Sequence, residues 1–107
     1  MAILNVQKAS LTGLTPVFVL ADKDGNSFTN DGKVILYIKN GGDSPVTVTI
    51  DSQHLCNYGF DHNVVVVIPA TEERIIGPFR QDRFNDATGK VVVAYSGVTS
   101  VTVAAIG

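Results

Sequence analysis

Two histidines and the one cysteine lie close together in the chain, and they are the first residues whose side chains could do chemistry. His54, Cys56 and His62 supply imidazole and thiol ligands, which zinc and copper prefer in proteins. A structural zinc site needs four ligands, and a blue-copper site usually adds a weak methionine ligand, whereas the single methionine here is Met1. We therefore predict no metal site and interpret the segment as a loop with a buried thiol and two surface imidazoles.

A second group of polar residues has part of the spacing of a calcium-binding loop. Asp22, Asp24 and Asn26 match the first three ligands of an EF-hand. The glycine of that motif would fall at Ser27 and its bidentate acid at Lys33, and the flanking residues favour strands over helices. We therefore interpret the segment as a hairpin turn.

Catalysis would need a nucleophile with a base, or a pair of acids, and both are weakly represented. Cys56 with a nearby histidine is one candidate pair, and Glu72 with Glu73 is the other. Adjacent residues of a strand face opposite sides, so the two glutamates cannot act together in one site. The sequence also has no glycine-rich nucleophile elbow or phosphate-binding loop. We predict that the protein is not an enzyme and needs no cofactor.

Aromatic and arginine residues gather in the segment 77–85, and this composition is enriched at protein interfaces. Two tyrosines in expected strands add further aromatic surface. The candidate interface residues are Phe79, Arg80, Arg83, Phe84, Tyr37 and Tyr95. An alternative stays open, in which the two phenylalanines close the hydrophobic core and only the arginines face solvent.

Length and composition restrict the class of protein. The 107 residues fit one domain, 1–107, and the net charge of −2 comes with no basic run that would bind nucleic acid. The longest apolar runs, 64–70 and 91–95, are too short to cross a membrane. Because the N-terminus has no apolar leader pattern and the chain has one cysteine, we expect synthesis in a reducing cytoplasm.

Valine and threonine are frequent, and ten glycines and four prolines interrupt the chain at short intervals. β-branched residues favour strands, and no long window keeps a helical spacing of apolar residues. These features predict an all-β antiparallel β-sandwich, jelly-roll or immunoglobulin-like, with little or no helix and a polar loop at 80–90 that buries Phe84. The expected strands are 2–8, 17–20, a short one around Phe28, 33–40, 46–51, 64–68, 74–76, 90–96 and 101–106.

Three stretches of the expected strands are apolar on both faces, whereas a strand of an isolated sandwich should alternate between apolar and polar residues. They are 34–38, 64–67 and 91–95. Their outward side chains need a cover, and a chain of this size has no helical layer to supply it. We interpret them as contact surfaces for another subunit or partner. The alternative is that they are scattered surface valines, which are common in proteins.

Short strand-and-turn blocks follow one another in a distinctive order from about residue 26 onward. They are 30–33, 39–42, 45–48, 67–70, 76–79, 84–86, 93–96 and 98–105. In the combination and order of these blocks the chain resembles a set of small tailed-bacteriophage and prophage proteins encoded among virion structural genes. The first residues match less well, and we expect 1–15 to form an extended arm laid on a neighbouring molecule.

The resemblance implies a capsid decoration, or cement, protein with no catalytic motif. Such a protein would bind major capsid subunits and copies of itself, with a trimer as the expected assembly, and would be located on the virion surface after synthesis in the host bacterial cytoplasm. A head–tail connector or tail-associated component is the nearby alternative. A carbohydrate- or peptide-binding β-sandwich is an alternative from another class, although the absence of tryptophan argues against a platform for sugar stacking.

Overall fold

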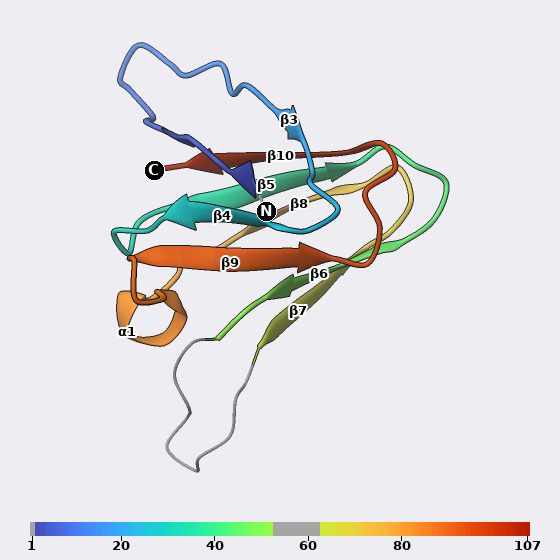
Figure 1. The fold of residues 1–107 in the computed structure, drawn as a ribbon. Helices are drawn as coiled ribbons and strands as arrows, with labels where there is room; N and C mark the ends of the chain where they lie inside the picture. Colours follow the sequence, from blue (N-terminus) through green and yellow to red (C-terminus); the bar gives the residue numbers. More distant parts are fainter. Residues whose placement is uncertain (1, 53–62) are drawn as a thin grey trace.

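Two β-sheets lie face to face and enclose the hydrophobic core between them (Figure 1). The computed structural model describes residues 2–52 and 63–107 of the chain. Strands account for 44% of these described residues and helix for 4%. The β-sandwich with little helix that the sequence predicts is thereby confirmed.

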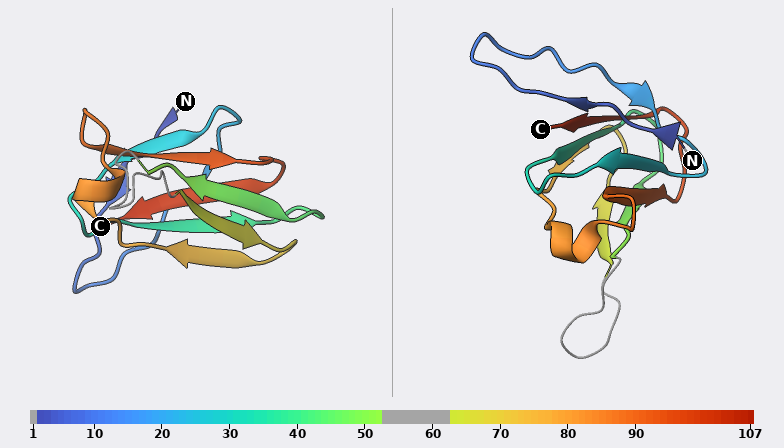
Figure 2. Two further views of the ribbon diagram at one scale, coloured as in Figure 1. Left: turned by 90° about the horizontal axis from the view of Figure 1, so that it is seen from below. Right: turned by 60° about the vertical axis from the view of Figure 1, so that its left-hand side comes forward.

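Sheet A has the strand order β1-β4-β9-β6-β7. Its strands are β1 (Ala2–Ile3), β4 (Asn26–Thr29), β9 (Lys90–Tyr95), β6 (Val46–Ile50) and β7 (Val64–Ile68). Sheet B has the order β2-β10-β5-β8, and β3 also pairs with β10. Its strands are β2 (Val6–Gln7), β10 (Val101–Ile106), β5 (Ile35–Asn40), β8 (Glu73–Ile76) and β3 (Val19–Leu20). The left view of Figure 2 shows the two sheets as separate layers.

The N-terminal segment joins both sheets instead of forming the single strand 2–8 that we expected. β1 pairs in parallel with β4 of sheet A, and β2 pairs in parallel with β10 of sheet B. Between them the side chain of Leu4 is buried, and its backbone N–H donates to the carbonyl oxygen of Ser27 at 2.7 Å. The sheets are therefore mixed, although the remaining strand pairs of the described residues are antiparallel as expected.

Residues 2–7 do not form the extended arm that the sequence predicts for 1–15. Residues 2–7 pair with strands of their own chain, because Leu4 contributes to the core and both neighbouring pairs offer main-chain hydrogen bonds. The segment 8–18 has no strand pairing of its own and connects β2 to β3 (Figure 1).

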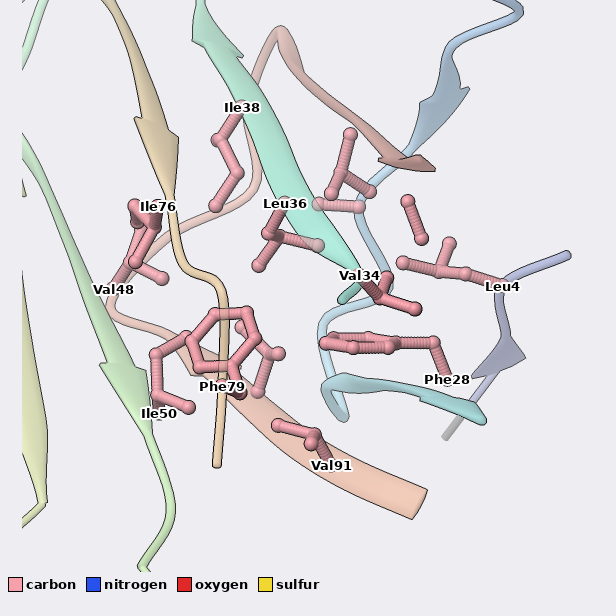
Figure 3. Packing of buried hydrophobic residues seen from close by; sticks show 14 of the residues in the cluster. Leu4, Phe28, Val34, Leu36, Ile38, Val48, Ile50, Ile76, Phe79 and Val91 are labelled. Atoms are coloured by element: carbon pink, nitrogen blue, oxygen red, sulfur yellow. The ribbon is translucent and has the colours of Figure 1, made fainter. Parts of the chain in front are cut away.

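The core follows the alternation of side chains along the strands. In β6 the valines and Ile50 are buried while the two threonines between them are half-exposed, as expected for a strand with one wet face. β5 alternates in the same way, with Leu36 and Ile38 fully buried. Figure 3 shows these side chains from both sheets meeting around Phe79. Each large apolar side chain buried here contributes about 1.5–3 kcal/mol to folding.

One tight turn requires glycine. Gly25 precedes β4 with a φ of +97°, and a Cβ at this position would lie 2.6 Å from the carbonyl oxygen of Val93. Both the left-handed backbone and the close approach of β9 exclude a larger residue. The turn before β4 is therefore fixed by backbone geometry.

A short helix, α1 (Gln81–Phe84), occupies part of the region that we expected to be an irregular polar loop. The backbone N–H of Phe84 donates to the carbonyl oxygen of Arg80, and that of Asn85 donates to Gln81. Phe84 is buried, as the sequence predicts, because the helical turn directs its side chain into the core.

Candidate interaction surface

Phe79 and Phe84, two of the candidate interface residues, lie in the core. Their side chains are only 2% and 5% exposed. The two rings meet edge to face with centroids 5.5 Å apart, and Phe79 also lies 5.7 Å from the ring of Phe28. A partner molecule could not reach either ring. The structure thus favours the alternative that the sequence left open, in which the phenylalanines close the core.

The two arginines of the same segment lie nearer the surface. Arg80 is exposed and forms a bidentate ion pair with Asp82, with Nη2 and Nε at 2.7 and 3.1 Å from the carboxylate oxygens. Arg83 lies with its guanidinium 4.8 Å from the centroid of the Phe84 ring. An exposed ion pair of this kind contributes about 0–1 kcal/mol to the stability of the fold. Because its side chain is exposed, Arg80 is also accessible to a partner.

Tyr37 lies on the outer face of sheet B, where it makes contacts within its own chain. Its hydroxyl donates to Oε1 of Glu73 at 2.7 Å, and this carboxylate raises the pKa of the tyrosine. The ring of Phe18 packs edge to face against it with centroids 5.0 Å apart, and Nζ of Lys39 lies 4.3 Å from the Phe18 centroid. Tyr37 is therefore partly covered by the N-terminal segment.

Tyr95 points toward the core side of sheet A, since it pairs with the buried Val48. Its hydroxyl donates to Oδ1 of Asn26 at 2.8 Å. Burial, together with the nearby charge of Asp22, raises the pKa of the Tyr95 hydroxyl above its ordinary range. This tyrosine thus holds the end of the sandwich together and offers little surface to a partner.

The outer face of sheet B is partly covered by the chain itself, while Ile75 on the same side is 61% exposed. Ala104 pairs with Tyr37 and shares its outward direction, yet it is only 2% exposed. Phe18 packs on this side, and the segment 8–18 is tied to β2 by two hydrogen bonds between the Gln7 side chain and the backbone of Val17, each 2.8 Å. Part of the cover that the two-sided apolar strands required therefore comes from within the molecule.

The outer face of sheet A carries apolar side chains that no described segment covers. Val65 and Val67 are 59% and 55% exposed, and they pair with Thr49 and Thr47 of β6. On the other side of β6, Thr49 pairs with Ala94 of β9. We call this surface the valine–threonine face, and its members are Thr47, Thr49, Val65, Val67, Val92 and Ala94.

Charge is absent from the middle of the valine–threonine face. Two charged residues, Asp51 and Lys90, lie on the same side of sheet A but at one end of the face. Asp51 is hydrogen-bonded to Val92, and Lys90 precedes Val92 by two residues on β9. The four valines at 64–67 were the sequence signal for this surface. The sequence did not indicate that the threonines of β6 belong to this surface, because an alternating strand is typical of an ordinary solvated face.

A second exposed apolar region lies where β2 and β3 separate at the edge of β10. A groove of about 280 Å³ opens there, and it is lined partly by Ile3, Val17 and Val19. These three side chains are themselves substantially exposed. The groove is shallow and apolar, and it has no charged side chain in its lining.

The residues considered for metal binding fall into two groups. His54, Cys56 and His62 lie outside the described residues. In the turn at Asp22, the carboxylate accepts from the backbone N–H of Asp24 at 3.0 Å, and the side chain of Asn26 donates to Ala2. These contacts serve the turn, and within 2–52 and 63–107 no group of three histidine, cysteine, aspartate or glutamate side chains could hold a metal ion. Over the same ranges, no helix has the length and apolar character needed to cross a membrane.

Comparison of the chain with family models, curated proteins and solved structures gave no match. Fold and surface define the chain as a β-sandwich protein in which the outer face of one sheet is partly covered by its own N-terminal segment and that of the other carries exposed apolar side chains.

Proposed function

We propose that this protein is a structural component of a phage virion, of the capsid decoration type, which strengthens the head by binding across major capsid subunits. The observation that carries this proposal is the valine–threonine face, where Val65 and Val67 are more than half exposed on a surface without central charge. Exposed apolar patches of this kind typically mark protein contacts.

The order of strand-and-turn blocks in the sequence supports the phage assignment. In the structure these blocks fall on β5, β6, β7, β8, β9 and β10, on the last residue of α1 and on the turns beside them. They are thus the parts that build the two sheets.

The binding mode follows from the flat shape of a sheet face. Apolar burial contributes about 25 cal/mol per Å² of surface removed from water, so a face of this size gives a modest affinity for one contact. Many copies on a shell would bind the same assembly at once, and each bridge between neighbouring capsid subunits resists their separation. Stabilisation would therefore grow with the number of copies bound.

Cosedimentation with purified capsids that lack this protein tests the proposal. We expect saturable binding of the wild-type chain and a higher temperature of capsid disruption. Thr49→Lys places a charge in the middle of the valine–threonine face and should weaken binding about tenfold or more, equivalent to ~1.4 kcal/mol.

The matched control for this experiment is Ile75→Lys. Ile75 is an exposed apolar residue on the outer face of sheet B, so it tests a charge of the same kind on the opposite side of the molecule. Absence of wild-type binding, or equal binding by both variants, would contradict the proposal.

A further inference from the structure

Strand β7 forms one edge of sheet A, and within the described residues it has none of the features that usually keep a sheet edge from pairing. It consists of four valines and an isoleucine, and it pairs with β6 on one side. No charged residue occurs between Asn63 and Thr71. Native edge strands are commonly protected by charged side chains, internal prolines, bulges or very short length.

The other sheet edges in the described part of the chain are protected. β1, β2 and β3 have two residues each. β8 carries Glu73, and it also carries Arg74, which pairs with Ile38 and so points toward the core side of the sheet. An inward-pointing charge of this kind disfavours pairing with another chain. The open edge is therefore a property of β7 alone among these strands.

The direction of the backbone groups on β7 follows from the bonds of β6. The N–H of Ser96 donates to the carbonyl oxygen of Thr47, so the main-chain groups of Thr47 and Thr49 face β9. Those of Val48 then face β7, where Val48 pairs with Val66. By the same alternation, the N–H and C=O groups of Val65 and Val67 point away from β6, toward the open edge.

We propose that two copies of this chain pair through β7, antiparallel, about a two-fold axis at Val66. In this register, Val65 of each copy lies opposite Val67 of the partner subunit, and the outward N–H and C=O groups of both residues face their counterparts across the axis. The half-buried Val66 meets its own copy on the core side. The two valine–threonine faces then become one continuous surface.

A second copy is the occupant that the residues favour, because the strand complements itself. Each side chain in the paired register meets a valine or isoleucine, and no like charges come together. The contact is isologous, so it closes after two copies and does not propagate. This arrangement is a dimer, in contrast to the trimer expected from the sequence. It is independent of the proposed capsid role, since it can be measured on the purified chain.

Charge-swapped variants test the register directly. Val65→Lys with Val67→Lys places lysines opposite lysines in a pair of identical copies, and Val65→Glu with Val67→Glu does the same with glutamates. We expect the wild-type chain to sediment as a dimer when its concentration is raised to about 1 mM, at which even a dimer with a millimolar dissociation constant is populated. Each double variant alone should be monomeric, with association weakened more than tenfold, and an equimolar mixture should form the mixed dimer. Ile75→Lys should dimerise like wild type.

A backbone variant separates pairing from side-chain effects. Val67→Pro removes an N–H that points to the open edge and leaves the bonds to β6 in place. It should abolish dimers while the circular dichroism spectrum stays that of the wild type. A monomeric wild-type chain, a trimer, or a mixture of the charged variants that fails to associate would each overturn the inference. Loss of capsid binding in Thr49→Lys with the dimer intact would bear on the capsid role alone.

Discussion

The side-chain amide of Gln7 and the backbone of Val17 form a closed pair of hydrogen bonds. Nε2 of Gln7 donates to the Val17 carbonyl oxygen, and the Val17 N–H donates to Oε1 of Gln7, both at 2.8 Å. The glutamine side chain thus supplies the donor and the acceptor that a neighbouring strand would otherwise offer to the backbone of Val17.

Gln7→Glu should loosen this connection, because the carboxylate keeps the acceptor and loses the donor. The two bonds are exposed, so we expect a loss of about 1 kcal/mol in the free energy of unfolding. Amide hydrogen exchange should become faster in residues 8–18 and stay unchanged in β5 and β6. Gln81→Glu, at an exposed glutamine with one long bond of 3.4 Å to Asn30, is the matched control. Equal effects of the two substitutions would contradict this role of Gln7.

Phe84→Ala and Arg80→Ala should differ sharply in stability, although the two residues lie in the same segment. Phe84 is buried against Phe79, so its truncation leaves a cavity and should cost about 3–5 kcal/mol. Arg80 is exposed, and its truncation should change stability by less than about 1 kcal/mol. Urea unfolding of both variants measures the difference. Similar values for the two would show that the ring does not close the core.

Asn40 should be one of the most sensitive polar residues. Its buried side chain donates to the carbonyl oxygens of Ser44 and Ile68, at 2.9 and 3.1 Å, and accepts from the N–H of Gly42. Asn40→Ala leaves these groups without partners, at a cost of about 1–3 kcal/mol for each group that stays buried.

Asn40→Asp should destabilise the fold further, because it brings a carboxylate close to carbonyl oxygens. Chemical denaturation measures both variants. The exposed Asn5 serves as control, and its change to alanine should stay within about 0.5 kcal/mol.

Asp86 should contribute to the acid sensitivity of the turn before β9. Its carboxylate accepts from the hydroxyl of Thr88 at 2.7 Å and from the backbone N–H groups of Thr88 and Lys90, and these bonds lower the pKa of Asp86. A folded-state pKa below the unfolded value of about 3.9 means stabilisation that is present above that pH. It is lost as the pH falls through the folded-state pKa.

Thr88→Val removes the strongest of these bonds, so the pKa of Asp86 should rise toward its ordinary value. Carboxyl chemical shifts measured during an NMR titration report this directly. An unchanged titration in Thr88→Val would show that the hydroxyl bond does not lower the pKa.

The positions of most strands in the sequence were predictable. Which side chains face the core and which face solvent was less predictable. β5, β6, β7, β9 and β10 follow from β-branched runs between turn residues; the bounds of β7 and β10 match expectation, and those of the other three differ by one or two residues at one end. The break at Leu4 was not predictable, because residues 2–8 have the pattern of one continuous strand and the choice between two sheet edges depends on tertiary contacts. The same limit applies to Phe79, whose position in a loop sequence says nothing of the direction of its ring.

Surface assignments failed for the same physical reason. Aromatic residues are common both in interfaces and in cores, so the composition of 77–85 could not separate the two. The valines of β7 were the more informative signal, because a strand with apolar residues on both faces has one face left over after the core is filled. Phe18 determines which outer face the chain partly covers, because its ring packs on sheet B. The sequence around Phe18 does not indicate on which sheet this ring lies.

The place of β10 sets the order in which the molecule can be assembled. Residues 101–106 lie inside sheet B, between β5 and the short strands β2 and β3, so the sheet stays incomplete until they have been synthesised. Until then, Leu36 and Ile38 lack part of their packing, and the N-terminal strand has no neighbour in sheet B. Folding therefore depends on contacts between residues far apart in sequence, which slow the search for the native state and extend the time that unpaired strands are open to other chains.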